Sequence, residues 1–283
     1  MRQQRPANAK EFFSQLGSRI LEDDVFGHAA QLGYYFLLSL FPLLLFLTTL
    51  LGIFARGDAE LQVNLLNYLA TVMPASSVAL VKATLIEISQ SAGGGKLSFG
   101  ILAMLWAASS GVESLVGALN KAYDVDADTR PFWRIRLIAL GLTMALAVLI
   151  NVALMLVLYG HRLGMWVKET CGFGSAFQWL WDLTQWPLII MCVMITFNLV
   201  YYFAPDRPQA RWRWFTIGSF TAFALWLLVS YAFRIYLHYF DSYSKTYGSL
   251  GAVIILMLWF YLMGAAIIIG AEINQILAVP DKE

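Results

Sequence analysis

Charged residues are scarce in this chain. Asp, Glu, Lys and Arg make up 13% of its 283 residues, about half of what a soluble domain usually carries. Hydrophobic residues make up 59% of the chain, and the mean hydropathy is +0.65. This composition excludes an ordinary soluble domain. The apolar segments also follow one another closely, so we expect one membrane domain and no separate soluble catalytic domain.

Cysteine and histidine are also rare. Cys171 and Cys192 fall in an expected loop and in an expected span, so no disulfide framework is predicted, and no Cys/His spacing is typical of zinc. The three histidines, His28, His161 and His238, lie at different depths. RNA hydrolysis needs metal-binding groups or an acid/base pair around the phosphate. We therefore expect no enzyme activity, no metal, no cofactor and no nucleic-acid partner.

What the chain has instead is six apolar segments, each about as long as the 20 residues that a transmembrane helix needs. They lie at 29–54, 97–120, 136–160, 183–204, 214–237 and 249–277. The first run lacks a small-residue cleavage site, so we expect a retained span. The predicted fold is an all-α integral membrane protein with about six transmembrane helices. Residues 1–28 form an N-terminal segment, 29–277 the membrane domain and 278–283 a tail.

The distribution of positive charge predicts the orientation. With the N-terminus inside, twelve Lys and Arg residues fall in short inner segments and seven in longer outer ones. The positive-inside rule then places both termini in the cytoplasm.

Two further regions have the spacing of amphipathic helices. Residues 8–25 place Phe12, Phe13 and Leu16 on one side, which is typical of a helix in the membrane interface and equally of one packed on the bundle. Residues 56–96 contain two apolar series at helical spacing. Those outer helices either cap a cavity or rest on the membrane surface.

Glu113 and Glu272 are the acids set within membrane-length apolar segments. Placing a charged carboxylate there costs roughly 3 kcal/mol or more of free energy unless it faces protein, water or a partner. Glu272 either reaches interfacial water or pairs with Arg134 or Arg136. Glu113 is either part of a substrate pathway or paired structurally. Small residues four apart around Gly111 and Gly270 predict close helix contacts beside both acids.

Four asparagines accompany these acids in or beside the spans: Asn120, Asn151, Asn198 and Asn274. In the predicted orientation, Glu113, Asn198 and Glu272 lie in the inner half of the membrane and Asn151 near its middle. If these faces converge, the six residues line a polar pathway open to the cytoplasm. The alternative for Asn151 and Asn198 is a simple hydrogen bond between helices, worth about 0.6 kcal/mol.

An ordered set of motifs resembles a known family. It includes Ala29-Ala-Gln-Leu-Gly-Tyr-Tyr-Phe-Leu-Leu-Ser-Leu-Phe-Pro42, Leu105-Trp-Ala-Ala-Ser-Ser-Gly111, Ala118-Leu-Asn-Lys-Ala-Tyr123, Arg130-Pro-Phe, Tyr247-Gly-Ser-Leu-Gly251 and Gly270-Ala-Glu-Ile-Asn274. From about residue 20 to 277 the chain is similar to the YihY/BrkB family of bacterial inner-membrane proteins, formerly labelled ribonuclease BN. The resemblance implies a six-helix protein of the inner membrane. It also implies that Glu272 and Asn274, which lie within the last of these motifs, are functional residues shared with the family.

These observations leave three functions open. The first is a transporter or flippase-like protein for a lipid or an anionic amphiphile, with membrane lipids as partners. The second is a scaffold or envelope assembly factor that transports nothing. The third is a membrane enzyme, which we expect least. An oligomer is compatible with each.

Overall fold

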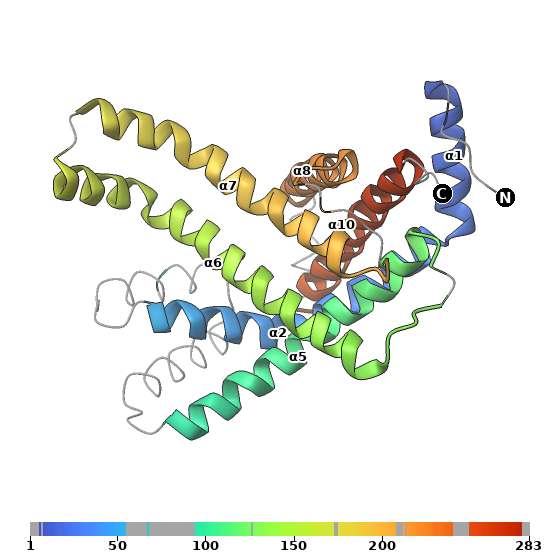
Figure 1. The fold of residues 1–283 in the computed structure, drawn as a ribbon, viewed down its shortest axis with the longest axis horizontal. Helices are drawn as coiled ribbons and strands as arrows, with labels where there is room; N and C mark the ends of the chain where they lie inside the picture. Colours follow the sequence, from blue (N-terminus) through green and yellow to red (C-terminus); the bar gives the residue numbers. More distant parts are fainter. Residues whose placement is uncertain are drawn as a thin grey trace.

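The computed structural model describes residues 6, 8–54, 67, 94–125, 127–172, 175–207, 212, 214–239 and 249–278. In these ranges the chain is helical and contains no strand. The helices are α1 (Ala9–Glu22), α2 (Val25–Phe54), α5 (Gly94–Ala122), α6 (Phe132–Cys171), α7 (Ser175–Phe203), α8 (Ile217–Tyr239) and α10 (Ser249–Leu277) (Figure 1). The predicted outer helices between residues 56 and 96 lie almost wholly outside the described residues.

Five of the described helices are long and apolar enough to cross a membrane. These stretches are Leu102–Ala122, Phe132–Thr170, Phe177–Phe203, Ile217–Tyr236 and Val253–Leu277. The 30-residue helix α2 contains no Asp, Glu, Lys or Arg. The all-α membrane fold is therefore confirmed, and the sixth span stays a prediction for α2.

Two helix boundaries differ from the predicted spans. Helix α6 continues to Cys171 and α7 already begins at Ser175, whereas the spans were placed at 136–160 and 183–204. The apolar pattern locates only the part that suits hydrocarbon, and polar residues such as His161 and Arg162 are compatible with a continuing helix. Gly172 follows the last residue of α6 with a left-handed φ of 70°, a common way for a helix to end.

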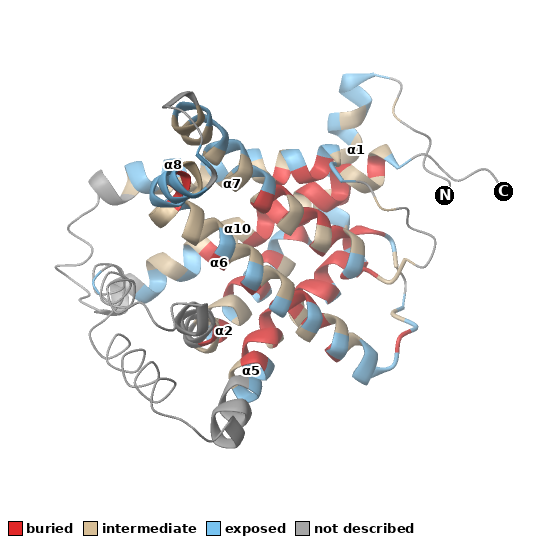
Figure 2. Ribbon diagram, turned by 60° about the vertical axis from the view of Figure 1, so that its left-hand side comes forward, coloured by how far each residue is buried: buried red, intermediate tan, exposed pale blue. Residues whose placement is uncertain are grey.

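The helices meet in pairs. Helix α2 packs against α5 and α10, α10 packs against α8, and α6 packs against α7 and α5. Helix α1 and the C-terminal end of α10 lie together at one end of the bundle, which we call the α1 end, while α6 and α7 extend away as a long arm (Figure 1). Buried residues concentrate toward the α1 end (Figure 2). There Leu32, Leu119, Val200 and Ile268 form part of one core.

Glycines allow two of these helix pairs to approach closely, as the small-residue spacing predicted. A Cβ on Gly270 of α10 would meet the Tyr201 hydroxyl and the Gly218 carbonyl. A Cβ on Gly111 of α5 would lie 2.6 Å from Oγ of Ser39 on α2. The α8–α10 contact therefore has no room for a side chain at its crossing.

Helix α1 confirms the predicted N-terminal helix and shows how it attaches. It packs against α10 and α2, with Arg19 buried and Ile20 against the core. Phe13 and Leu21 remain 67% and 78% exposed. A charged residue, Arg19, thus anchors α1 on the bundle together with Ile20, while Phe13 and Leu21 stay uncovered by the described protein.

Candidate polar site at the α1 end of the bundle

Arg19 joins three parts of the chain at the α1 end. Its Nε donates a 2.5 Å hydrogen bond to Glu272 Oε2 on α10, and its two terminal nitrogens each lie 3.1 Å from a carboxylate oxygen of Asp124. One of them also donates to the Ala122 carbonyl at 3.0 Å. The side chains of Arg19 and Glu272 are 3% and 0% exposed. The predicted partners of Glu272, Arg134 and Arg136, were wrong.

The charge on Arg19 is favoured by its partners. Burial acts to lower the pKa of its guanidinium, but the hydrogen bonds with Asp124 and Glu272 outweigh burial and raise the pKa above its ordinary value. A buried ion pair is tolerated only when its remaining donors and acceptors are satisfied. Glu272 departs from that rule, because its Oε1 is buried and has no hydrogen-bond partner among the described residues.

The residues after Glu272 bind two further helices. Asn274 accepts a 2.9 Å hydrogen bond from the Gly218 amide of α8 and donates a 3.2 Å one to the Tyr123 hydroxyl. Gln275 donates to Asp124 at 2.9 Å. Asp124 itself has a φ of 57°, a left-handed conformation that costs energy in a residue with a side chain. One turn of α10 thus organises the ends of α1, α5 and α8.

A second group, the Arg130 cluster (Asn120, Asp128, Arg130, Asp206), lies beside it. Arg130 donates to both carboxylate oxygens of Asp128, at 2.8 and 2.6 Å, and to the Ala204 carbonyl at 2.9 Å. Asn120 donates to Asp128 and accepts from the Asp206 amide, both at 2.8 Å. Hydrogen bonds from Arg130 lower the pKa of Asp128 to about 2. This cluster fixes the α5–α6 connection to the end of α7.

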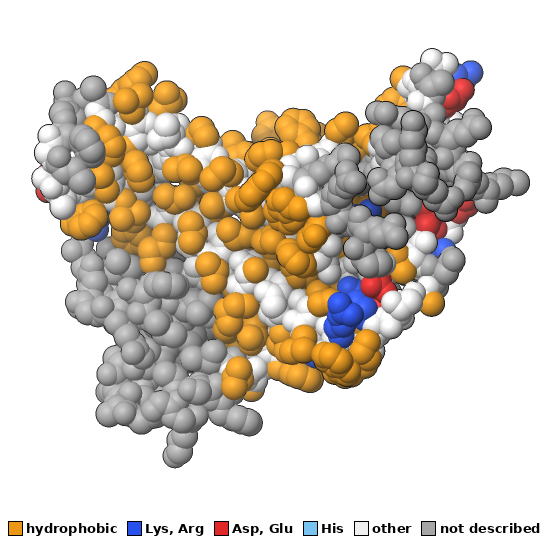
Figure 3. All heavy atoms as spheres, in the orientation of Figure 1, with side chains coloured by type: hydrophobic (Ala, Val, Ile, Leu, Met, Phe, Trp, Pro, Cys, Tyr) orange, Lys and Arg blue, Asp and Glu red, His pale blue; other side chains and the backbone are white. Residues whose placement is uncertain are grey.

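Glu113 belongs to neither group. It forms an ion pair with Arg136, and its side chain is 29% exposed. Arg136 also donates to the Trp106 carbonyl at 2.6 Å and lies 4.1 Å from the centroid of the Trp106 ring. Glu113 therefore has its own cation within the membrane domain. Hydrophobic side chains cover the middle of the visible face, and charged ones gather toward the α1 end (Figure 3).

Asn151 and Asn198 are buried, but among the described residues neither side chain bonds to another helix, in contrast to one of the two expectations. Each donates to the carbonyl four residues earlier in its own helix, Ala147 at 2.9 Å and Met194 at 2.7 Å. Their side-chain oxygens are buried and have no partner in the part of the chain that the structure describes. These two oxygens are available acceptors inside the bundle.

The structure thus divides the six predicted residues. It brings Asn120, Glu272 and Asn274 to the α1 end, and it connects none of Glu113, Asn151 and Asn198 to them by hydrogen bonds of the described side chains. Sequence reasoning missed Arg19, Asp124 and Asp128. The available signals were an arginine within an amphipathic helix and the acids just before Arg130.

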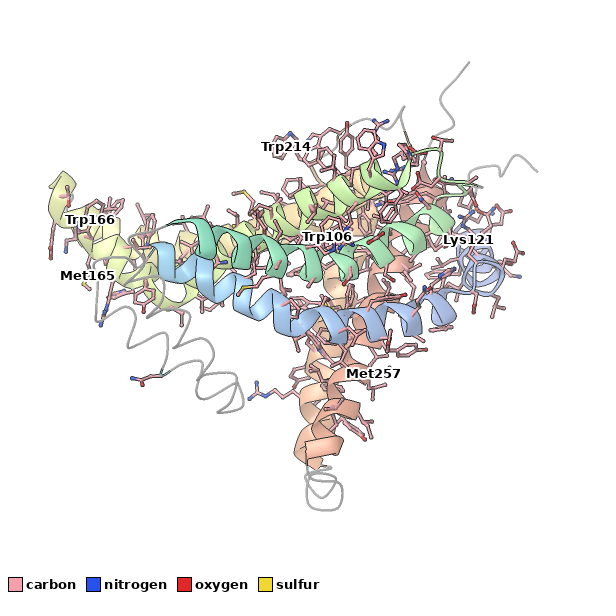
Figure 4. The ribbon with its side chains drawn as sticks, turned by 90° about the horizontal axis from the view of Figure 1, so that it is seen from below. Trp106, Lys121, Met165, Trp166, Trp214 and Met257 are labelled. Carbon is pink, nitrogen blue, oxygen red and sulfur yellow. The ribbon has the colours of Figure 1, made fainter. Side chains whose placement is uncertain are left out.

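No group of three His, Cys, Asp or Glu residues that could hold a metal occurs in the described ranges. Cys192 is a buried free thiol. Lys121, on α5, forms an ion pair with Asp23 at 3.2 Å, and 53% of the Lys121 side chain is exposed. It lies next to α1 and far from Trp166, which is on α6 (Figure 4). The chemistry present at the α1 end is hydrogen bonding and ion pairing.

Comparisons with known proteins agree with the fold. The family model described as Virulence factor BrkB matches residues 16–282. A Bacillus subtilis protein named ribonuclease-like protein YfkH is 37% identical over 266 residues, which is 94% of each chain. UPF0761 membrane proteins of Stenotrophomonas maltophilia and Vibrio campbellii are 28% and 27% identical over 96% and 94% of this chain. The chain spans 62% of the former and 82% of the latter. No solved structure matches significantly.

Proposed function

The chain belongs to the BrkB family of multi-pass membrane proteins, and on that premise we propose that it is a transporter or flippase-like protein for a lipid or an anionic amphiphile. We place it in the bacterial inner membrane with both termini in the cytoplasm, so that the α1 end faces the cytoplasm. The proposed pathway uses Glu272 and Asn274 at that end, with Asn151 and Asn198 deeper in the bundle.

The observation that carries this proposal is the environment of Glu272. Ionisable residues inside membrane domains commonly belong to substrate or ion pathways. Glu272 is fully buried, yet one of its oxygens lacks a described partner. The cation that neutralises it comes from α1, a short helix outside the apolar spans. Moving α1 would therefore uncover the acid without unfolding any span.

This arrangement supports a gate. In the closed state Arg19 donates hydrogen bonds to both Glu272 and Asp124. When Arg19 leaves, Glu272 needs a new hydrogen-bond donor or cation, because an unpaired buried charge is strongly unfavourable. A polar headgroup that donates hydrogen bonds meets that need. A population shift of α1 is thus coupled to binding at the α1 end.

Proteoliposomes containing the purified full-length chain test this proposal. The rate at which fluorescent phosphatidylglycerol changes leaflet is measured by dithionite quenching. We expect protein-dependent movement that falls at least roughly tenfold in Glu272→Gln, because the transition state loses a charge-assisted bond worth about 1.5–3 kcal/mol. Glu113→Gln is the matched control, since it removes an acid with a separate partner. A rate equal to that of empty liposomes would refute transport.

The arm formed by α6 and α7 favours a scaffold as the second candidate. Trp166 and Trp179 are 64% and 67% exposed, and Trp166 lies far from the α1 end (Figure 4). Exposed aromatic residues are enriched at protein interfaces. Crosslinking in membranes distinguishes the candidates. A stoichiometric protein partner lost in Trp166→Ala and Trp179→Ala, together with no lipid movement, would establish the scaffold instead.

We propose that the chain has no ribonuclease activity, although its Bacillus relative carries a ribonuclease-like name. Its histidines are far apart in sequence, and Glu272 and Asp128 at the α1 end are paired with arginines. Purified protein incubated with RNA and Mg²⁺, Mn²⁺ or Zn²⁺ tests this. Metal-dependent cleavage that copurifies with the folded chain would contradict it.

A further inference from the structure

Arg207, just beyond the end of α7, differs from the buried arginines in having no carboxylate partner among the described residues. Arg19, Arg130 and Arg136 each contact a carboxylate. Arg207 contacts none among the described residues, although it is partly buried. Burial lowers the pKa of its guanidinium below the ordinary value. A desolvated cation without an anion is an unfavourable arrangement that a bound anion would relieve.

The contacts of Arg207 hold its guanidinium in a defined plane. Its Cζ lies 3.7 Å from the centroid of the Tyr123 ring, a short cation–π distance. The Tyr123 hydroxyl is held by Asn274, so the ring that supports Arg207 is itself anchored to α10. The face of the guanidinium is therefore occupied, while its edge carries the donors.

Those donors have few good hydrogen-bond acceptors among the described residues. One terminal nitrogen donates to the Tyr201 carbonyl at 3.4 Å, which is long for a hydrogen bond. The Nε is buried and has no partner in the described structure. Capping the carbonyl end of α7 explains a positive charge at this position. It leaves the Nε–H and the remaining donors of the edge unexplained.

The neighbouring acid, Asp206, forms no ion pair with Arg207 in the described structure. Asp206 accepts from the Thr129 amide and hydroxyl, at 2.9 and 2.6 Å, and lies 3.6 Å from Arg130 Nε. Its charge is thus directed into the Arg130 cluster. The sequence from Arg207 to Thr216 also contains three arginines and no acid.

We propose that Arg207, supported by the Tyr123 ring, binds a phosphate group, supplied either by a lipid headgroup or by free phosphate. The planar guanidinium fork matches phosphate oxygens in a bidentate arrangement. Through Tyr123 and Asn274 the site is connected to the α10 turn that carries Glu272. That this phosphate belongs to a transported substrate rests on the proposed function. The binding itself does not.

Thermal unfolding of the full-length chain in neutral detergent tests the site. Dioctanoyl phosphatidylglycerol should raise the unfolding temperature of the wild type, and dioctanoylglycerol, which lacks the phosphate, should not. Arg207→Gln should weaken the apparent affinity for the phospholipid by roughly ten- to a hundredfold, since a charge-assisted bond is lost. Arg134→Gln, an exposed arginine at the start of α6, is the matched control and should respond like the wild type.

Inorganic phosphate separates the two sources. Stabilisation by phosphate that competes with the lipid shows that the free anion reaches the site, while stabilisation by the lipid alone assigns the headgroup. If neither stabilises the wild type, or if Arg207→Gln responds as the wild type does, the proposal is wrong. Should Arg207→Gln fail to fold, Arg207→Lys keeps the charge without the fork, and unchanged affinity there would also overturn it. Binding without lipid movement in proteoliposomes refutes transport alone.

Discussion

Arg19 and Glu272 are 253 positions apart in sequence and form a 2.5 Å hydrogen bond between buried side chains. The bond connects a short N-terminal helix to the last helix of the membrane domain. Because Arg19 also holds Asp124, one guanidinium determines how α1, α5 and α10 meet.

Replacing Arg19 should destabilise the protein strongly. Arg19→Met leaves Glu272 buried without its cation, which typically costs about 3–5 kcal/mol. Lys121→Met removes the pair between Asp23 and Lys121, whose side chain is 53% exposed, and should cost less than about 1 kcal/mol. Unfolding temperature in detergent and protease sensitivity of α1 measure both. Equal effects of the two variants would refute the central role of Arg19.

The double variant Arg19→Met/Glu272→Met separates pairing from packing. Removing both charges avoids an unpaired buried group, and such replacements are often neutral or stabilising. We expect the double variant to be more stable than Arg19→Met alone. An additive loss from the two substitutions would show that they act independently.

Alanine at Gly218 or Gly270 should disrupt the α8–α10 contact. A new Cβ at either position meets backbone or the Tyr201 hydroxyl, and overpacking costs about 1–3 kcal/mol or more. Gly117→Ala and Gly141→Ala are controls, since a Cβ there meets nothing within 4 Å; they should be neutral or slightly stabilising. Unfolding temperatures that fall alike in all four variants would contradict the packing argument.

Asp128 should make stability depend on pH in the acid range. Its pKa is about 2 in the folded chain against an ordinary 3.8. A lowered carboxyl pKa stabilises the fold above the unfolded value, and this contribution is lost as the pH falls from about 4 to about 2. Thermal unfolding of wild type and Asp128→Asn at pH 5 to 2 checks this. We expect the wild-type advantage to shrink over that window, and a constant difference would argue against it.

Trp181 should fasten α7 to α6 within the arm. Its Nε1 donates a 2.6 Å hydrogen bond to the Gly160 carbonyl. Trp181→Phe keeps an aromatic ring but loses that bond, at a cost of about 0.5–1.5 kcal/mol. Hydrogen exchange of residues 156–185 should become faster, whereas Trp179→Phe, at an exposed position, should leave it unchanged. Identical exchange in both variants would show that the bond does not limit opening.

The membrane class and the helical architecture follow from local properties of the sequence. Apolar length, helical spacing and small residues four apart are each visible within about 20 residues. They predicted the membrane helices, α1 and the tight contact at Gly270. They did not predict the end of α6, because its continuation beyond residue 160 depends on polar residues that are compatible with a helix.

The ion-pair and hydrogen-bond partners of these polar residues could not be predicted from the sequence. Glu272 has Arg19 as its cation instead of Arg134 or Arg136, because α1 folds back onto α10. Arg136 is occupied by Glu113. The amides of Asn151 and Asn198 bond within their own helices, which spacing cannot distinguish from bonds between helices. Pairings over long sequence separations depend on the packing of whole helices.

The separation of Arg19 from Glu272 also imposes an order on biogenesis. Synthesis runs from the N-terminus, so Arg19 exists while most of the spans are still unmade. Glu272 lies on α10, the last of the described helices to be synthesised. Until α10 has been made, Arg19 can bond to Asp124 and the Ala122 carbonyl but not to Glu272. The Arg19–Glu272 pair therefore forms only after the last described helix, α10, has been added to the bundle.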